Sequence, residues 1–302
     1  MSSRRRSSST GANSDWLASR RPSGCIARVS IEVRPLSALI GAEVLGVDLR
    51  APLAAADVSA IETALLDHLV VFFRGQDVTP KQQIAFARQF GEISIPPITP
   101  KYGTDPELVV LDQVSPKGEG ADAWHSDNTF MAEPPMGSIL KAVQLPAVGG
   151  DTCFASMYAA YEALSLPVRA LVDELRAVHD LTRPLQKAIV AGHSTADLGE
   201  LQKKWPPVEH PVARTHPQTS RKALYVNRNS TTHLVGLSER ENEVLLPFLV
   251  DHVRSPQFQC RFHWDVGSIA FWDNRSVQHY AVPDYTERRV MHRVTLSGDA
   301  PR

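Results

Sequence analysis

The chain has 302 residues, of which 43% are hydrophobic and 22% are charged, and this composition is ordinary for a globular protein. Its 32 basic residues nearly balance its 33 acidic residues, so we expect neither a nucleic acid nor a membrane surface as its partner. The three cysteines are far apart and odd in number, which argues against a disulfide framework and a structural zinc site and favours a reducing, cytoplasmic setting.

The amino-terminal residues 1–26 are rich in serine and arginine and lack the apolar segment of a secretory signal. We expect a disordered tail there. The chain contains no run of about 18 apolar residues, so we predict no membrane-spanning helix. Residues 27–302 contain neither a repeat nor a linker, and the economical interpretation is a single domain.

The first part of this domain predicts alternating strands and helices. Residues 27–36 alternate in polarity like a half-buried strand, and residues 40–49 follow as the second strand of a hairpin. Residues 56–69 have apolar side chains at helical spacing, and a short buried strand comes next. Thr79 and Pro80 are suited to begin a second helix.

From residue 105 onward, short strand-like runs dominate, as is typical of a β-sandwich or barrel. The runs are ELVVLDQV, GSILKAVQL, DTCFASM, ALYVN, GSIAFWDN and RRVMHRVTL. Two helices interrupt them at residues 156–178 and 238–252, the second with a capping box formed by Ser238 and Glu241. The predicted fold class is therefore mainly β with flanking helices.

Residues 183–209 lie between these two helices and lack clean periodicity. They include two glycines and the pair Pro206 and Pro207. Long irregular segments of compact domains are commonly functional loops or exposed insertions. We predict either a mobile lid or an exposed excursion for this segment.

The stretch WHSDNTF places His125 two residues before Asp127. On a strand, residues i and i+2 project from the same face, so the imidazole and the carboxylate can converge on one metal ion. For this pair taken alone, a polar turn at a strand end is the alternative.

A third ligand has to come from another part of the chain. His279 follows a buried apolar strand and a polar turn, so we expect it to lie on the strand that returns to the same barrel. Two imidazoles and one carboxylate form the facial triad that suits Fe(II), whereas zinc more often draws cysteine or a third histidine. Most other histidines are better explained by helix ends, turns or strands, namely His68, His193, His210, His216, His233, His252, His263 and His292.

Arg289 and Arg293 lie four residues apart, so on a strand both project from the face that holds Met291. Two guanidiniums that enter one cavity are costly to bury unless anions pair with them. One can bind the distal carboxylate of a keto acid and the other an anionic substrate group. The alternative is a solvated strand face with Asp284 and Glu287 as partners.

Eight motifs occur in order along the chain, which are WHSDNTF, PAVGGDT, YAAYEALS, EHPVARTHP, ALYVN, VGLSERE, WDNRSVQHYAVPDY and RRVMHRVTLSGD. From near residue 30 to the end, the chain resembles the taurine dioxygenase family of Fe(II)/2-oxoglutarate-dependent oxygenases. The resemblance implies a double-stranded β-helix, which is a jelly-roll, cupin-like barrel with helices packed outside. It also implies that 2-oxoglutarate and dioxygen are co-substrates.

By position, the resemblance implies three Fe(II) ligands, namely His125, Asp127 and His279. It implies that the Thr152 hydroxyl and the Arg289 guanidinium bind 2-oxoglutarate. The loop before Arg289 is one residue shorter than in the taurine enzymes, and Arg288 is the less favoured substitute for Arg289.

Arg293 matches the arginine that holds the substrate sulfonate in the taurine enzymes, and four other positions depart from them. Pro96 replaces a histidine donor, and Ser230 replaces a pocket aromatic. Ala121 replaces an asparagine, and Asn128 replaces a small apolar residue. We therefore expect Arg293, Asn128, Ser230 and Pro96 to border a pocket that is roomier than a taurine pocket.

The implied function is a dioxygenase of taurine catabolism or related sulfur metabolism that hydroxylates a small anionic substrate next to its leaving group. Taurine or a related alkylsulfonate or alkyl sulfate would yield sulfite or sulfate, an aldehyde, succinate and carbon dioxide. The alternatives are an aryloxyalkanoate dioxygenase that releases a phenol, a non-catalytic β-barrel anion-binding protein, and a zinc-dependent hydrolase. We also expect a homo-oligomer, either a dimer or a tetramer.

Overall fold

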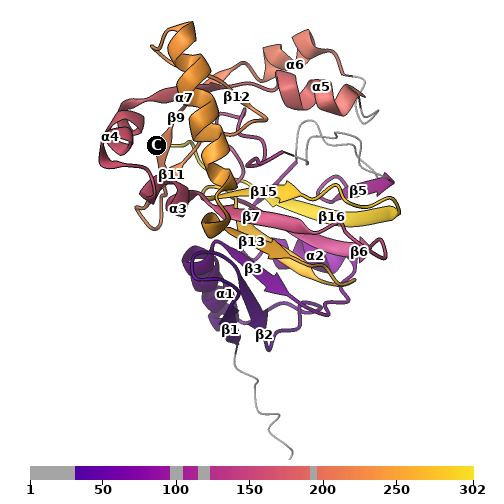
Figure 1. The fold of residues 1–302 in the computed structure, drawn as a ribbon. Coiled ribbons are helices and arrows are strands. Elements are labelled where there is room, and N and C mark those ends of the chain that lie inside the picture. Colours follow the sequence, from indigo (N-terminus) through magenta and orange to yellow (C-terminus); the bar gives the residue numbers. More distant parts are fainter. Residues whose placement is uncertain (1–30, 96–104, 115–122, 191–195) are drawn as a thin grey trace, which may run out of the picture. The chain divides into compact units, whose positions relative to one another are not determined.

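An eight-stranded sheet organises the fold (Figure 1). The computed structural model describes residues 31–95, 105–114, 123–190 and 196–302. The strands of this sheet follow the order β1-β2-β3-β14-β6-β16-β4, with β5 also paired to β16, and β2 and β3 run parallel. Their bounds are β1 Glu32–Pro35, β2 Ala42–Leu45, β3 Val70–Phe73, β4 Ile93–Ser94, β5 Val109–Val114, β6 Gly137–Gln144, β14 Ile269–Asp273 and β16 Arg288–Leu296.

A second sheet of order β13-β7-β15 packs face to face against the first. Its bounds are β7 Thr152–Ser156, β13 Gln259–Phe262 and β15 Val277–Ala281. Phe72 of β3 stacks on Phe262 at 3.9 Å between ring centroids and meets Phe154 edge-on at 5.6 Å. The two layers form the predicted jelly roll, although in the described residues they remain separate sheets rather than a closed barrel.

Two helices cover the other face of the large sheet, namely α1 Ala55–His68 and α2 Pro80–Ala87. Ile61 and Leu65 of α1 are buried because they lie on the helix face that packs against apolar strand residues such as Val71. The predicted start of α2 is confirmed, since Thr79 caps the helix and Pro80 is its first residue.

The remaining described elements are two small sheets and several helices. Two small sheets have the orders β12-β8-β9 and β10-β11. Their bounds are β8 Arg176–His179, β9 Val208–Pro211, β10 Ala213–Thr215, β11 Lys222–Leu224 and β12 Thr231–Leu234. The helices are α3 Met157–Glu162, α4 Leu166–Glu174, α5 Thr182–Val190, α6 Leu198–Lys204 and α7 Glu239–Asp251, followed by the short η1 His252–Arg254 and η2 Pro256–Phe258.

The prediction of one continuous helix at residues 156–178 is wrong. The segment forms α3 and α4, and its last residues belong to strand β8. The break comes at Ser165, which is the N-cap of α4, and Pro167 lies in the first turn of that helix. Proline lacks an amide hydrogen and clashes with the preceding helical turn, so it is well tolerated in the first turn of a helix and costly in the interior.

Residues 183–209 lack clean periodicity in the sequence, yet α5 and α6 form most of this segment. Leu185 of α5 is buried with Phe130, and Leu198 and Leu201 of α6 pack against this cluster. This segment therefore lies against the end of the WHSDNTF stretch. Its function as a lid stays a prediction, and residues 191–195 lie outside the described part of the chain.

Other predictions are confirmed or lie outside the structure. The opening hairpin exists as β1 and β2, and the capping box of Ser238 and Glu241 begins α7. In the described part of the chain, no helix has both the length and the apolar character that a bilayer crossing requires. The tail predicted at residues 1–26 lies outside the described residues.

The contacts of Phe72 generate a stability prediction. Phe72→Ala should lower the free energy of unfolding by about 3–5 kcal/mol, because it opens a cavity between the two sheets. Phe248→Ala in α7 is the matched control, since this ring is 50% exposed and its loss should cost roughly 1 kcal/mol or less. Urea unfolding of both variants measures the difference, and equal losses would show that the ring pair does not hold the layers together.

Candidate active site

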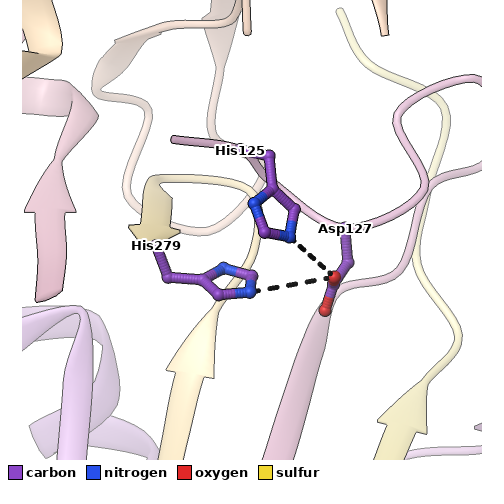
Figure 2. A group of neighbouring side chains, drawn as sticks. All are labelled: His125, Asp127 and His279. Atoms are coloured by element: carbon purple, nitrogen blue, oxygen red, sulfur yellow. Dashed lines mark ion pairs between the residues drawn. The ribbon is translucent and has the colours of Figure 1, made fainter. Parts of the chain in front are cut away.

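The candidate metal centre forms where two segments distant in the sequence meet. His125 forms an isolated antiparallel bridge with His279 of β15, and each amide donates to the other's carbonyl at 3.1 and 2.8 Å. The Nε2 atoms of His125 and His279 lie 3.6 and 3.9 Å from Asp127 Oδ1 (Figure 2). The three ligand atoms all lie within 4.8 Å of one another, so one ion can bind all of them.

The backbone at this centre differs from the predicted strand. His125 takes part in a single bridge, and Asp127 already lies in the turn that follows. Asn128 has a φ of 49°, in the left-handed region that asparagine tolerates better than most residues. The carboxylate therefore reaches the imidazoles through a turn rather than through the pleat of a strand.

The two imidazoles present their Nε2 atoms to the Asp127 carboxylate. His125 Nδ1 lies 2.7 Å from the Ala123 carbonyl oxygen, which holds the ring N–H there and leaves the Nε2 lone pair for a metal. Burial and the neighbouring His125 lower the pKa of His279 to about 3, so this ring is neutral near pH 7. Two imidazoles and one carboxylate are the donor set of the Fe(II) facial triad.

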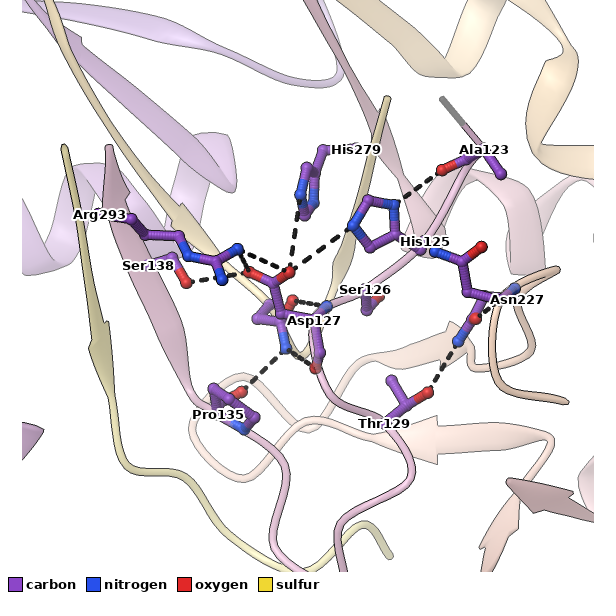
Figure 3. A network of polar contacts seen from close by, with 12 residues as sticks. Ala123, His125, Ser126, Asp127, Thr129, Pro135, Ser138, Asn227, His279 and Arg293 are labelled. Carbon is purple, nitrogen blue, oxygen red and sulfur yellow. Dashed lines mark hydrogen bonds and ion pairs between the residues drawn. The ribbon is translucent and has the colours of Figure 1, made fainter. Parts of the chain in front are cut away.

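The Asp127 carboxylate is buried yet ionised. Burial alone would raise its pKa, but the positive charge of Arg293, with smaller contributions from His279 and His125, holds that pKa well below its usual range. Arg293 Nη1 lies 3.2 Å from Oδ1, and Ser138 Oγ donates to Oδ2 at 3.1 Å (Figure 3). These contacts orient the carboxylate so that Oδ1 faces both Nε2 atoms.

Arg289 and Arg293 turn inward from β16, as their spacing predicts. Arg289 is 4% exposed, and the side chain of Arg293 is 14% exposed, so the alternative of a solvated strand face is wrong. Arg288, which lies one residue before Arg289 on β16, points outward and pairs with Asp112. The alternation of the strand thus separates the two inner cations from the outer one.

Arg289 presents a donor that its protein surroundings leave unused. Its Nε donates to the Gly150 carbonyl at 3.1 Å, whereas its buried Nη2 has no hydrogen-bond partner within the described structure. Burial lowers the pKa of this guanidinium, which still remains charged near neutral pH. A carboxylate that reached Arg289 would satisfy this donor and neutralise the buried charge.

The GGDT turn holds Arg289 in place. Gly150 has a φ of +76°, and a Cβ there would lie 3.2 Å from Arg289 Cδ, so glycine meets both the backbone and the space requirement. Thr152 begins β7 two residues later and is buried, and its hydroxyl accepts a hydrogen bond from Trp264 Nε1 at 3.0 Å. The hydroxyl hydrogen of Thr152 is left to donate elsewhere.

Two of the other predicted pocket residues are described by the structure. Ser230 is buried before β12, and its amide donates to Asn227 Oδ1 at 2.9 Å. Asn128 is partly exposed, and its positive φ provides a backbone reason for asparagine at this position. Pro96 lies outside the described residues.

A buried polar network that the sequence did not reveal supports the other side of the ligand turn. Thr129 Oγ1 accepts a hydrogen bond from Asn227 Nδ2 at 2.9 Å and pairs with His179 Nδ1 at 2.9 Å. His210 Nε2 lies 2.9 Å from the Thr129 carbonyl oxygen, and burial lowers the pKa of His179 and His210 to about 3 and about 4. His179 was missed because the strand that it ends, β8, begins within the helix predicted at residues 156–178.

A facial triad held by a jelly roll defines a mononuclear non-haem iron oxygenase. Residues 32–295 match the family described as "Taurine catabolism dioxygenase TauD, TfdA family", and the chain belongs to this family. The protein is therefore a dioxygenase that depends on Fe(II) and on 2-oxoglutarate, also called alpha-ketoglutarate.

Relatives of known function differ in their substrates. The chain is 38% identical over 282 residues to an alpha-ketoglutarate-dependent sulfate ester dioxygenase of Pseudomonas putida, covering 90% of this chain and 91% of the relative. It is 35% identical over 294 residues to an alpha-ketoglutarate-dependent 2,4-dichlorophenoxyacetate dioxygenase of Cupriavidus pinatubonensis, and the match covers 90% of this chain and 99% of the relative. The solved structure of a taurine dioxygenase from Burkholderia xenovorans matches with a TM-score of 0.77 and 41% identity, and the match covers 90% of this chain and 91% of that structure.

The ligand set predicts that metal stabilises the fold. At 100 times its dissociation constant, Mn(II) should add about 2.7 kcal/mol and raise the Tm by about 5 °C. Asp127→Ala should reduce the rise to roughly 1 °C or less, whereas Asp112→Ala, which removes a carboxylate that pairs outside with Arg288, should retain it. Thermal scans with and without Mn(II) measure this, and an undiminished rise in Asp127→Ala would place the metal elsewhere.

Proposed function

We propose that the enzyme oxidises an alkyl sulfate ester or an alkylsulfonate at the carbon next to the sulfur-bearing group. The observation that carries this proposal is Arg293, a largely buried cation whose Nη1 lies 3.2 Å from the Asp127 carboxylate. A sulfo group that paired with this guanidinium would lie beside the metal ligands. The similarity to a sulfate ester dioxygenase supports this class of anion.

The proposed reaction consumes the substrate, 2-oxoglutarate and dioxygen. One oxygen atom enters the substrate C–H bond and the other enters succinate, while 2-oxoglutarate loses carbon dioxide. The hydroxylated carbon then releases sulfate or sulfite, loses its hydroxyl proton and becomes an aldehyde. The bound metal supplies the activation of dioxygen, whereas the protein orients the substrate and the co-substrate around it.

For 2-oxoglutarate we propose a site formed by Arg289 and Thr152. The unpartnered Nη2 of Arg289 and the free hydroxyl hydrogen of Thr152 both suit a carboxylate. The absence of a side chain at Gly150 supports this assignment, because it lets Arg289 lie against the turn that leads to Thr152.

For the substrate pocket we propose walls formed by Ser230, Asn128 and Pro96, together with Arg293. A serine in place of an aromatic, and a proline in place of a histidine donor, favour a longer alkyl chain over taurine itself. Of the three wall residues, Asn128 is the weakest candidate because its positive φ already explains its identity.

An aryloxyalkanoate is the second candidate substrate. It is favoured by the 35% identity to a 2,4-dichlorophenoxyacetate dioxygenase. Its carboxylate would pair with the same Arg293, and hydroxylation of the carbon next to the ether oxygen would release a phenol.

A substrate panel separates these candidates. Succinate formation should be measured with medium-chain alkyl sulfates, alkylsulfonates, taurine and 2,4-dichlorophenoxyacetate, together with the release of sulfate, sulfite or phenol. We expect sulfate or sulfite in equal amount to succinate, with the highest kcat/KM for an alkyl sulfate or alkylsulfonate longer than taurine. Phenol release with a higher kcat/KM would overturn this proposal in favour of the second candidate.

Arg289→Lys tests the proposed co-substrate site. Loss of the planar, two-point donor should raise the KM for 2-oxoglutarate by about 10- to 100-fold. Arg288→Lys is the matched control, because this neighbouring guanidinium is exposed and pairs with Asp112. Initial rates at varied 2-oxoglutarate give both values, and an unchanged KM in Arg289→Lys would remove Arg289 from the site.

A further inference from the structure

Asn274 lies between β14 and β15, and its side chain is hydrogen-bonded to the backbone of a metal ligand. Its Oδ1 accepts from the Asp127 amide at 2.7 Å, and its Nδ2 donates to the Asp127 carbonyl at 3.0 Å. Nδ2 also donates to the Pro135 carbonyl at 3.1 Å, and Asn274 is fully buried. One side-chain amide thus pairs with both backbone polar groups of Asp127, as a neighbouring strand would.

Asp127 needs such a partner because it lies in a turn. The single bridge at His125 does not extend to Asp127, and the next residue, Asn128, has a positive φ. Asp127 is 5% exposed, so water cannot replace a lost partner for its amide and carbonyl. A buried backbone group without a hydrogen bond is costly, and a shift of this turn would move the attached carboxylate.

The same turn leads directly into the strand that carries His279. The Asn274 amide donates to the Met136 carbonyl at 2.8 Å, which fixes the turn against the start of β6. Ser126 Oγ donates to the Val277 carbonyl at 2.7 Å, between the Asn274 contact and the bridge at His279. The ligand segment is therefore attached to the β14–β15 turn and to β15 at three successive points.

We propose that Asn274 is a positioning residue that sets the distance between the Asp127 carboxylate and the His279 imidazole, and thereby the affinity for the metal. The proposal rests on the assignment of Asp127 and His279 as ligands and not on the substrate. An aspartate at position 274 would keep one acceptor, but it would place an oxygen against two carbonyl oxygens. An alanine would leave all three backbone groups without their partner.

Asn242 in α7 provides a matched control, because it makes the same kind of clamp away from the metal ligands. Its Oδ1 accepts from the Leu234 amide at 2.6 Å, and its Nδ2 donates to the Leu234 carbonyl at 3.2 Å. Nδ2 also donates to the Leu237 carbonyl at 3.2 Å. Nδ2 donates to the Ser238 carbonyl at 3.2 Å as well, so the Asn242 variants remove the same kinds of side-chain to backbone hydrogen bond and one more.

The test compares Asn274→Ala and Asn274→Asp with Asn242→Ala and Asn242→Asp in the full chain. Each protein is titrated with Mn(II), and with Fe(II) under anaerobic conditions, without substrate, and the stability of the metal-free form is measured in parallel. We expect the Asn274 variants to bind metal about 10- to 100-fold more weakly than the wild type. We expect the Asn242 variants to bind within about twofold of the wild type while losing stability themselves.

Wild-type affinity in the Asn274 variants, or an equal loss in the Asn242 variants, would overturn the proposal and leave Asn274 a structural residue only. Asn274→Asp keeps the side-chain volume, and it provides the test if Asn274→Ala does not fold. Ser126→Ala provides an independent variant, since it removes the neighbouring bond to Val277 and should weaken metal binding in the same direction. Because the titration contains no substrate, its outcome is independent of the substrate panel.

Discussion

The active site depends on one buried negative charge, the carboxylate of Asp127. An isolated carboxylate in the interior would take up a proton, but Arg293 and Ser138 stabilise the ionised form. These two partners come from β16 and β6, whereas His279 comes from β15 in the other sheet. The packing of the two layers therefore holds His279 and Arg293 at fixed distances from the carboxylate.

Much of this centre could be predicted from the sequence because it follows from strand geometry. An even spacing places Arg289 and Arg293 on one face, and both side chains turn inward in the structure. A histidine after a buried strand and a polar turn identified His279, which lies on β15 as expected. His125 and Asp127 indicate a metal site only together with His279, since a His-x-Asp pair alone is compatible with a polar turn.

The remaining features could not be predicted because they depend on contacts between distant residues. The ligand segment forms a bridge and a turn, and it requires a partner such as Asn274, which lies 147 positions away in the chain. Nothing local marks Ser138 as a partner of Asp127, or Thr129 as a partner of Asn227 and His179, because a buried hydroxyl looks like any other small residue of a strand or turn. The break before α4 is a different case, because Pro167 is a local signal in the sequence that favours the start of a helix at this point.

Anaerobic addition of Fe(II) and 2-oxoglutarate to the purified protein tests the central claim most directly. If 2-oxoglutarate chelates iron held by His125, Asp127 and His279, a weak charge-transfer band should appear in the visible spectrum and should require both additions. The same additions to Asp127→Ala should give no band. The absence of the band in the wild type, or an equal band in Asp127→Ala, would contradict the assignment of this site.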